Sequence, residues 1–220
     1  MVYNSLTEAP RNLKEGIDWL MAVKGTNIMK TSKAMGAALH KFLGIVKLIS
    51  MEFLEQEELK DQKFVKKVLE MINGSTDRKP GDFAKTMGSN PDAVAQNLRY
   101  VVDGCEKFLN HIKNPDQYKS AYSPEVTWDA SCSASPEDCA AVFVGMAPML
   151  YAGLLSLWDA GRSNPLKWLK RNKKSLAEVL KAVGYDEPEC RTPITASNVI
   201  NSLRNVDKES LDRLYNLAGF

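Results

Sequence analysis

The feature that most constrains the fold is a stretch of 20 residues without a charge, which runs from Cys139 to Trp158. A helix of about this length can cross a bilayer. Its apolar side chains are diluted by glycine, alanine, serine and proline, however, and Asp138 and Asp159 stand immediately outside it. A helix that is apolar all round also suits the centre of a globular helical domain. We therefore expect a buried central helix over about 139–158, with a transmembrane helix as the alternative.

Helical periodicity continues through most of the chain, and strand signals are almost absent. We expect the first helix to follow a Thr7 cap and to stop at Gly25. A longer helix is expected over about 27–60. Two further helices should begin at Asn90-Pro91-Asp92 and at Ser135-Pro136-Glu137, because each segment combines a capping side chain with a first-turn proline and an acid.

Glycines and a proline lie inside two of these predicted helices. A break near Gly36 or Gly44 is an alternative to one continuous long helix. Pro148 should bend or split the central helix, because proline has no N–H to donate. Over about 113–134 the helical pattern stops for 22 residues. Loops of this length usually carry a function or are tied down.

These patterns predict an all-α fold: an irregular multi-helix bundle around the apolar helix of about 139–158, with a long loop at about 113–134. Residues 1–220 should form a single helical domain, with sub-lobes 1–112 and 135–220 as a possible division. With 44% hydrophobic and 25% charged residues, the composition is that of a globular protein. It excludes disordered and collagen-like classes.

The composition also provides few of the histidine and cysteine side chains that catalytic and metal sites commonly use. The chain has two histidines and four cysteines, and its 29 basic and 27 acidic residues give a formal net charge of +2. Nucleotide-binding, zinc-protease and serine-hydrolase motifs are absent. We therefore predict a protein with no enzymatic activity, no metal and no cofactor. No nucleic-acid partner is expected, because the net charge is too small.

The four cysteines are Cys105, Cys132, Cys139 and Cys190, separated by 27, 7 and 51 positions. This spacing contains no Cys-x-x-Cys pair and no nearby histidine, so it does not predict a zinc site. Disulfides and free buried thiols both remain open. Four cysteines allow three pairings, and the spacing does not choose among them.

Aromatic residues mark the loop at 113–134 as a candidate partner-binding surface. Tyr118, Tyr122 and Trp128 lie on this irregular segment. Exposed aromatic rings on loops are common binding anchors. The alternative is that the three rings pack back onto the helices and belong to the core.

A basic segment at 162–174 is the sharpest local charge feature. It contains six cations and no acid: Arg162, Lys167, Lys170, Arg171, Lys173 and Lys174. Such a face can bind phosphates, glycans or an anionic membrane. The alternative is that the segment is purely structural: a short helix that buries Trp168 and Leu169 and leaves its cations in water. If the segment is functional, the protein is an intracellular helical effector or adaptor that binds phosphate-bearing partners or a membrane through residues 162–174.

Two segments resemble a known family. The first, over residues 5–25, contains Asn12-Leu-Lys-Glu-Gly-Ile-Asp-Trp19 and ends in Gly25. The second, over residues 138–186, contains Asp138-Cys139, Val142-Phe-Val-Gly145, Pro148, Leu150-Tyr151, Gly153-Leu154, Leu157-Trp158, Leu166-Lys167 and Val183-Gly184-Tyr185. Together they resemble the variant erythrocyte surface antigens of Babesia parasites, in the order in which that family carries them.

The resemblance implies export to the surface of the infected red cell, antigenic variation and adhesion to host cells. The partners it implies are a host cell-surface receptor or an antibody, and a partner subunit of a surface antigen complex. It also favours disulfides, because the outer cell surface is oxidising. Typical members are much longer and end in a transmembrane helix. The chain is therefore expected to be a trimmed ectodomain or a small related protein, which meets the membrane only through a segment outside this chain.

Overall fold

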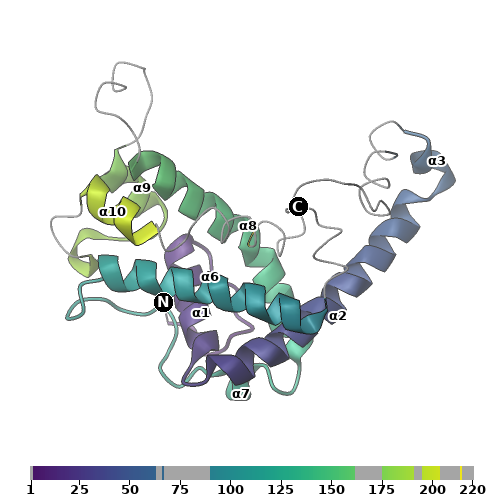
Figure 1. The fold of residues 1–220 in the computed structure, drawn as a ribbon, viewed down its shortest axis with the longest axis horizontal. Coiled ribbons are helices and arrows are strands. Elements are labelled where there is room, and N and C mark those ends of the chain that lie inside the picture. The colour runs from purple at the N-terminus through teal and green to yellow at the C-terminus, as the bar shows by residue number, and fades with distance from the viewer. Residues whose placement is uncertain are drawn as a thin grey trace.

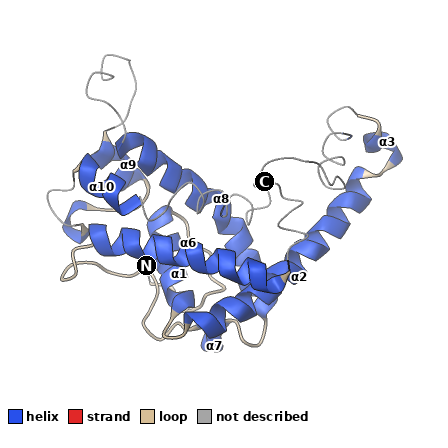
Figure 2. Cartoon of the chain, viewed as in Figure 1, coloured by secondary structure: helices blue, strands red, loops and turns tan. Residues whose placement is uncertain are grey.

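The computed structural model describes residues 2–62, 66, 90–161, 175–190, 195–203 and 214. These residues are mostly helical and contain no β-strand, which confirms the all-α prediction (Figure 2). The helices in chain order are α1 (Leu13–Lys24), α2 (Ile28–Leu54), α3 (Glu57–Lys60), α6 (Pro91–Ile112), α7 (Trp128–Ser131), α8 (Pro136–Gly161), α9 (Leu176–Ala182), the 3₁₀ helix η2 (Glu187–Glu189) and α10 (Ala196–Leu203).

The core lies where α1, α2 and α10 each contact both α6 and α8 (Figure 1). Helix α1 is the most enclosed of the described helices, since eight of its 12 residues are buried. The largest fully buried side chains include Trp19 of α1, Phe108 of α6 and Phe143 of α8. Three helices that are far apart in the sequence therefore each contribute a fully buried ring to one shared core.

The predicted helix starts at 90–92 and 135–137 are confirmed, because α6 begins at Pro91 and α8 at Pro136. The Asn90 side chain caps α6 by accepting from the Ala93 N–H at 2.8 Å. The predicted Thr7 cap of α1 is wrong. Asn12 holds that place, and its Oδ1 accepts from the Glu15 N–H at 3.0 Å. An asparagine one residue before the apolar stripe is as good a cap as threonine, so the earlier residue had no advantage.

Helix α2 runs without a break through both of its glycines. Gly36 lies so close to α6 that a Cβ there would stand 2.7 Å from the backbone nitrogen of Ala95. Its absent side chain permits this close approach and so compensates its weak helix propensity. Gly25 ends α1 as predicted, with φ of 49° and its N–H donating to the Met21 carbonyl.

We expected Pro148 to bend or to split the central helix; helix α8 continues through Pro148, so the split does not occur. By length and composition this helix is apolar enough to cross a membrane, and it is the one such helix among the described residues. It packs against α1, α2, α9 and α10, with Phe143, Leu150 and Leu157 buried. These contacts place it within the helical bundle, as the first of our two interpretations expects.

Candidate functional site

The long loop after α6 is held at several points along its length. The Tyr3 N–H donates to the Ala121 carbonyl at 2.8 Å, and the Ser123 N–H donates to the Tyr3 carbonyl at 3.0 Å. Nearer its start, the Asn114 N–H donates to the Glu189 carbonyl at 2.8 Å. The N-terminal segment and the segment after α9 therefore hold the loop, and their hydrogen bonds satisfy backbone groups that an irregular segment would otherwise leave to water.

The aromatic rings of this loop are part of the core. Tyr122 and Trp128 are 3% and 4% exposed, and Tyr118 is half-buried against the same cluster. Tyr122 stacks on Tyr3 with ring centroids 4.8 Å apart, and its hydroxyl donates to the Glu8 carbonyl at 2.6 Å. Of the two interpretations of these rings, the structure therefore agrees with packing onto the helices, and the three rings are not exposed binding anchors.

A buried carboxylate, Asp18 on α1, is the main polar attachment of the loop. It is 2% exposed and accepts hydrogen bonds from the Tyr118 hydroxyl at 2.5 Å and from the Ala121 N–H at 2.8 Å. The Lys14 ammonium lies 3.7 Å from the same carboxylate, one helical turn away. Both oxygens of Asp18 thus have partners inside the chain, so its role is structural rather than that of an open acid or base.

Lys14 connects this carboxylate to the segment after α9. Its ammonium donates to the Lys119 carbonyl at 2.7 Å and lies 3.3 Å from the Glu189 carboxylate. It also stands 4.9 Å from the centre of the Tyr118 ring. One largely buried cation therefore faces two acids, a carbonyl and an aromatic ring, a set that compensates its loss of hydration.

Burial dominates the titration of this cluster. It raises the pKa of Asp18, although the Tyr118 and Ala121 hydrogen bonds and the Lys14 charge oppose the rise. Burial also raises the pKa of Tyr118, and the nearby Asp18 charge adds to the effect. Tyr118 therefore remains a protonated donor over the whole physiological range, as its bond to Asp18 requires.

The Tyr185 hydroxyl lies beside this cluster and is the one buried side-chain polar atom without a partner in the described part of the chain. Burial raises its pKa, and Asp18, Cys105 and Cys190 add to the rise. Its ring meets Phe108 edge-on, with centroids 6.0 Å apart. We place this residue in the packing of α6 against the segment after α9.

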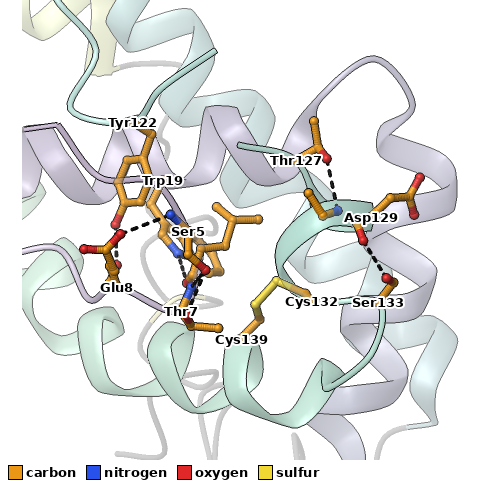
Figure 3. Close-up of a disulfide and its surroundings, with 12 residues drawn as sticks. Ser5, Thr7, Glu8, Trp19, Tyr122, Thr127, Asp129, Cys132, Ser133 and Cys139 are labelled. Atoms are coloured by element: carbon orange, nitrogen blue, oxygen red, sulfur yellow. Dashed lines mark hydrogen bonds between the residues drawn. A yellow bond between two sulfur atoms is a disulfide. The ribbon is translucent and has the colours of Figure 1, made fainter. Parts of the chain in front are cut away.

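Two of the four cysteines form a disulfide, and two are free. Cys132 bonds to Cys139 and so connects the end of the long loop to the first turns of α8 (Figure 3). Cys105 and Cys190 are buried thiols. Burial raises their pKa values to about 12 and about 11. Both remain protonated and poorly nucleophilic near neutral pH.

The α7 turn before the disulfide is built by two short polar side chains. The Thr127 hydroxyl accepts from the Ala130 N–H at 3.2 Å and caps α7. The Ser133 hydroxyl donates to the Asp129 carbonyl at 2.5 Å (Figure 3). These bonds hold Cys132 near the end of a defined turn, where it reaches Cys139 without a long flexible connection.

A groove of about 430 Å³ lies between the α1–α2 connection and the 120–129 part of the loop. Its lining is apolar toward Met21, Ala22 and Val126, while the outer lining consists of exposed polar side chains: Thr26, Asn27, Lys30, Ser120, Thr127 and Asp129. The Lys30 ammonium and the Asp129 carboxylate pair at 3.1 Å across this rim. We call these six residues the groove rim.

A second groove of about 520 Å³ lies where α2 and α6 begin, between Met29, Lys33 and Arg99. Within the described ranges, no group of three or more histidine, cysteine or acidic side chains could hold a metal ion. The basic segment at 162–174, with Arg162, Lys167, Lys170, Arg171, Lys173 and Lys174, lies outside the described residues. Its predicted anion-binding role stays a prediction.

Comparison with protein-family models, with curated proteins and with solved structures gave no significant match to this chain. The resemblance to the Babesia variant surface antigens therefore stays a prediction that depends on the residues quoted above.

Proposed function

We propose that the protein is a non-enzymatic helical domain, exported by a parasite to the surface of the infected red cell, where it is presented to host immunity and contacts host cells. The resemblance to the variant surface antigens supplies the biological context of this proposal. The structure supports it through one observation, the disulfide between Cys132 and Cys139. Disulfides persist in oxidising compartments and are rare in reduced cytosol.

The groove rim is the surface that we assign to partner contact. Its outer side chains are exposed, with 65% of the Lys30 side chain and 69% of the Asp129 side chain accessible to solvent. The loop backbone beneath them is held by Tyr3, Asp18 and the disulfide. A rigid backbone beneath exposed polar side chains is the arrangement of many recognition loops, because little conformational entropy is lost on binding.

Surface exposure on the source cell tests the export part of the proposal. Antibodies raised against the folded chain should stain intact infected red cells, and trypsin added outside should remove that staining. An antigen of the parasite cytosol should stay unstained until the cells are permeabilised. Staining that also requires permeabilisation would contradict the proposal.

Two arginine variants test the groove rim. Thr26→Arg places a bulky cation at the rim, while Ala141→Arg makes a comparable change at an exposed position of α8. We expect Thr26→Arg to weaken binding of the purified protein to host endothelial cells, and of rim-directed antibodies, at least tenfold. Ala141→Arg should bind like the unchanged protein. Equal binding by both variants would show that contact occurs elsewhere.

A further inference from the structure

The distal half of α2 carries an apolar stripe that the described part of the chain does not cover. Ile45, Leu48, Ile49 and Phe53 are 45%, 69%, 61% and 57% exposed. Figure 1 shows this half of the helix extending away from the bundle toward α3. We call these four residues the α2 stripe.

The spacing of the α2 stripe is that of a helix-pairing face. Its members recur at steps of three, one and four residues, so they lie on consecutive turns of one side of the helix. Apolar residues repeated in this way usually meet a second helix. Four large apolar side chains exposed together differ from isolated surface residues, which need no explanation.

We infer that the α2 stripe binds the same stripe of a second copy of this chain, with the two helices antiparallel and related by a two-fold axis between Leu48 and Ile49. An isologous contact of this kind requires one self-complementary patch, because every contact of one residue with a second residue of the other copy occurs twice, once in each direction. The α2 helix is self-complementary in charge, as the positions of its ionised side chains show.

The charge argument concerns Lys41 and Glu55. They lie 7.5 and 6.5 residues from the axis, so an antiparallel pair brings them level to within about 1.5 Å of helix rise, twice in each dimer. A parallel pair would instead place like charges level with each other. Lys41 already pairs with Glu137 of its own copy, but 65% of its side chain remains exposed and can face a second carboxylate.

The contact is short, about four helical turns on each copy. It falls below the roughly 800 Å² per partner that stable interfaces bury, so we expect a dimer of micromolar affinity. This inference is independent of the proposed function, since it concerns a different face of the molecule and a different measurement.

Sedimentation of the full chain over a range of concentrations tests the pairing. We expect the unchanged protein to pass from monomer to dimer between about 1 and 500 μM, the range that a micromolar dissociation constant requires. Leu48→Glu should stay monomeric throughout. Met29→Glu, at a 62% exposed apolar position of the same helix outside the stripe, should dimerise like the unchanged protein.

A charge exchange tests the antiparallel register. Lys41→Glu and Glu55→Lys should each weaken the dimer about tenfold, because each creates two like-charge pairs, and the double variant should recover the original affinity. A monomer at all concentrations would overturn the inference and indicate that other residues of this chain, or an unrelated partner, cover the stripe. Dimers that survive Leu48→Glu, or no recovery in the double variant, would overturn it equally.

Discussion

The Tyr118 hydroxyl donates a 2.5 Å hydrogen bond to the Asp18 carboxylate, across 100 positions of sequence. This bond joins the middle of the long loop to the most enclosed helix of the domain. The Ala121 N–H and the Lys14 ammonium complete the surroundings of the same carboxylate. The loop is therefore held by a buried acceptor provided by the first helix, in addition to the burial of its own rings.

Removal of that hydroxyl should loosen the loop. Tyr118→Phe keeps the ring beside Lys14 and deletes the donor to a charged acceptor, so we expect the free energy of unfolding to fall by about 1.5–3 kcal/mol. Urea denaturation measures it. Tyr100→Phe is the matched control, because that tyrosine is 43% exposed and its change should cost less than about 0.5 kcal/mol. Equal losses of unfolding free energy in the two variants would show that the hydrogen bond to Asp18 stabilises the fold no more than an exposed tyrosine hydroxyl does.

The raised pKa of Asp18 predicts a pH dependence of a definite sign. Because the folded state holds this proton more tightly than the unfolded state, ionisation of Asp18 lowers stability as the pH rises from below the ordinary aspartate pKa through the folded value. Asp18→Asn lacks this titration. The stability of the variant relative to the unchanged protein should therefore improve between pH 3 and pH 7, as followed by urea denaturation at each pH. A relative stability that worsens over this interval would mean that the folded-state pKa is lowered.

Two glycines of α2 should respond to alanine in opposite directions. Gly36→Ala would place a Cβ 2.7 Å from the Ala95 backbone, so we expect a loss of about 2 kcal/mol or more. Gly44→Ala meets open space and should gain about 0.5–1 kcal/mol from helix propensity. Thermal unfolding in dilute solution, where the chain is monomeric, measures both changes. The same sign for both variants would contradict the packing of α2 on α6.

Loss of the disulfide should destabilise the folded chain by releasing the end of the long loop. Cross-linking residues seven positions apart restricts the unfolded chain by about 2.5 kcal/mol in the chain-entropy model, so Cys132→Ser with Cys139→Ser should lose about that much. Dithiothreitol should lower the unfolding temperature of the unchanged protein and leave that of the double variant unaltered. Sensitivity of the double variant to the reductant would indicate a second disulfide.

Much of the fold could be predicted from local chemistry. The start of α6 follows from the Asn90 cap and from Pro91, and the start of α8 follows from Pro136 and the acids after it. The apolar periodicity identifies the core faces. The wrong predictions concern residues for which local rules offer equal choices. Thr7 and Asn12 are both good caps. At Pro148 the local rule allowed either a bend or a split, and the tertiary packing of α8 keeps the helix continuous.

The attachment of the loop could be predicted only in part. Asp18 carries one local signal, a charge between the core residues Ile17 and Trp19, four positions after Lys14. Its other partners, Tyr118 and Ala121, follow about 100 residues later, and no local rule connects them. The choice of Cys132 with Cys139 among three pairings likewise depends on how α7 meets α8.

Thiol counting on protein taken from its source cell tests the central claim, a helical domain of an oxidising compartment closed by one disulfide. We predict no reactive thiol in the native protein, two after denaturation and four after reduction, with residues 132 and 139 joined in one cross-linked peptide by mass spectrometry. Four thiols after denaturation alone, or a cross-link that includes Cys105 or Cys190, would contradict the account.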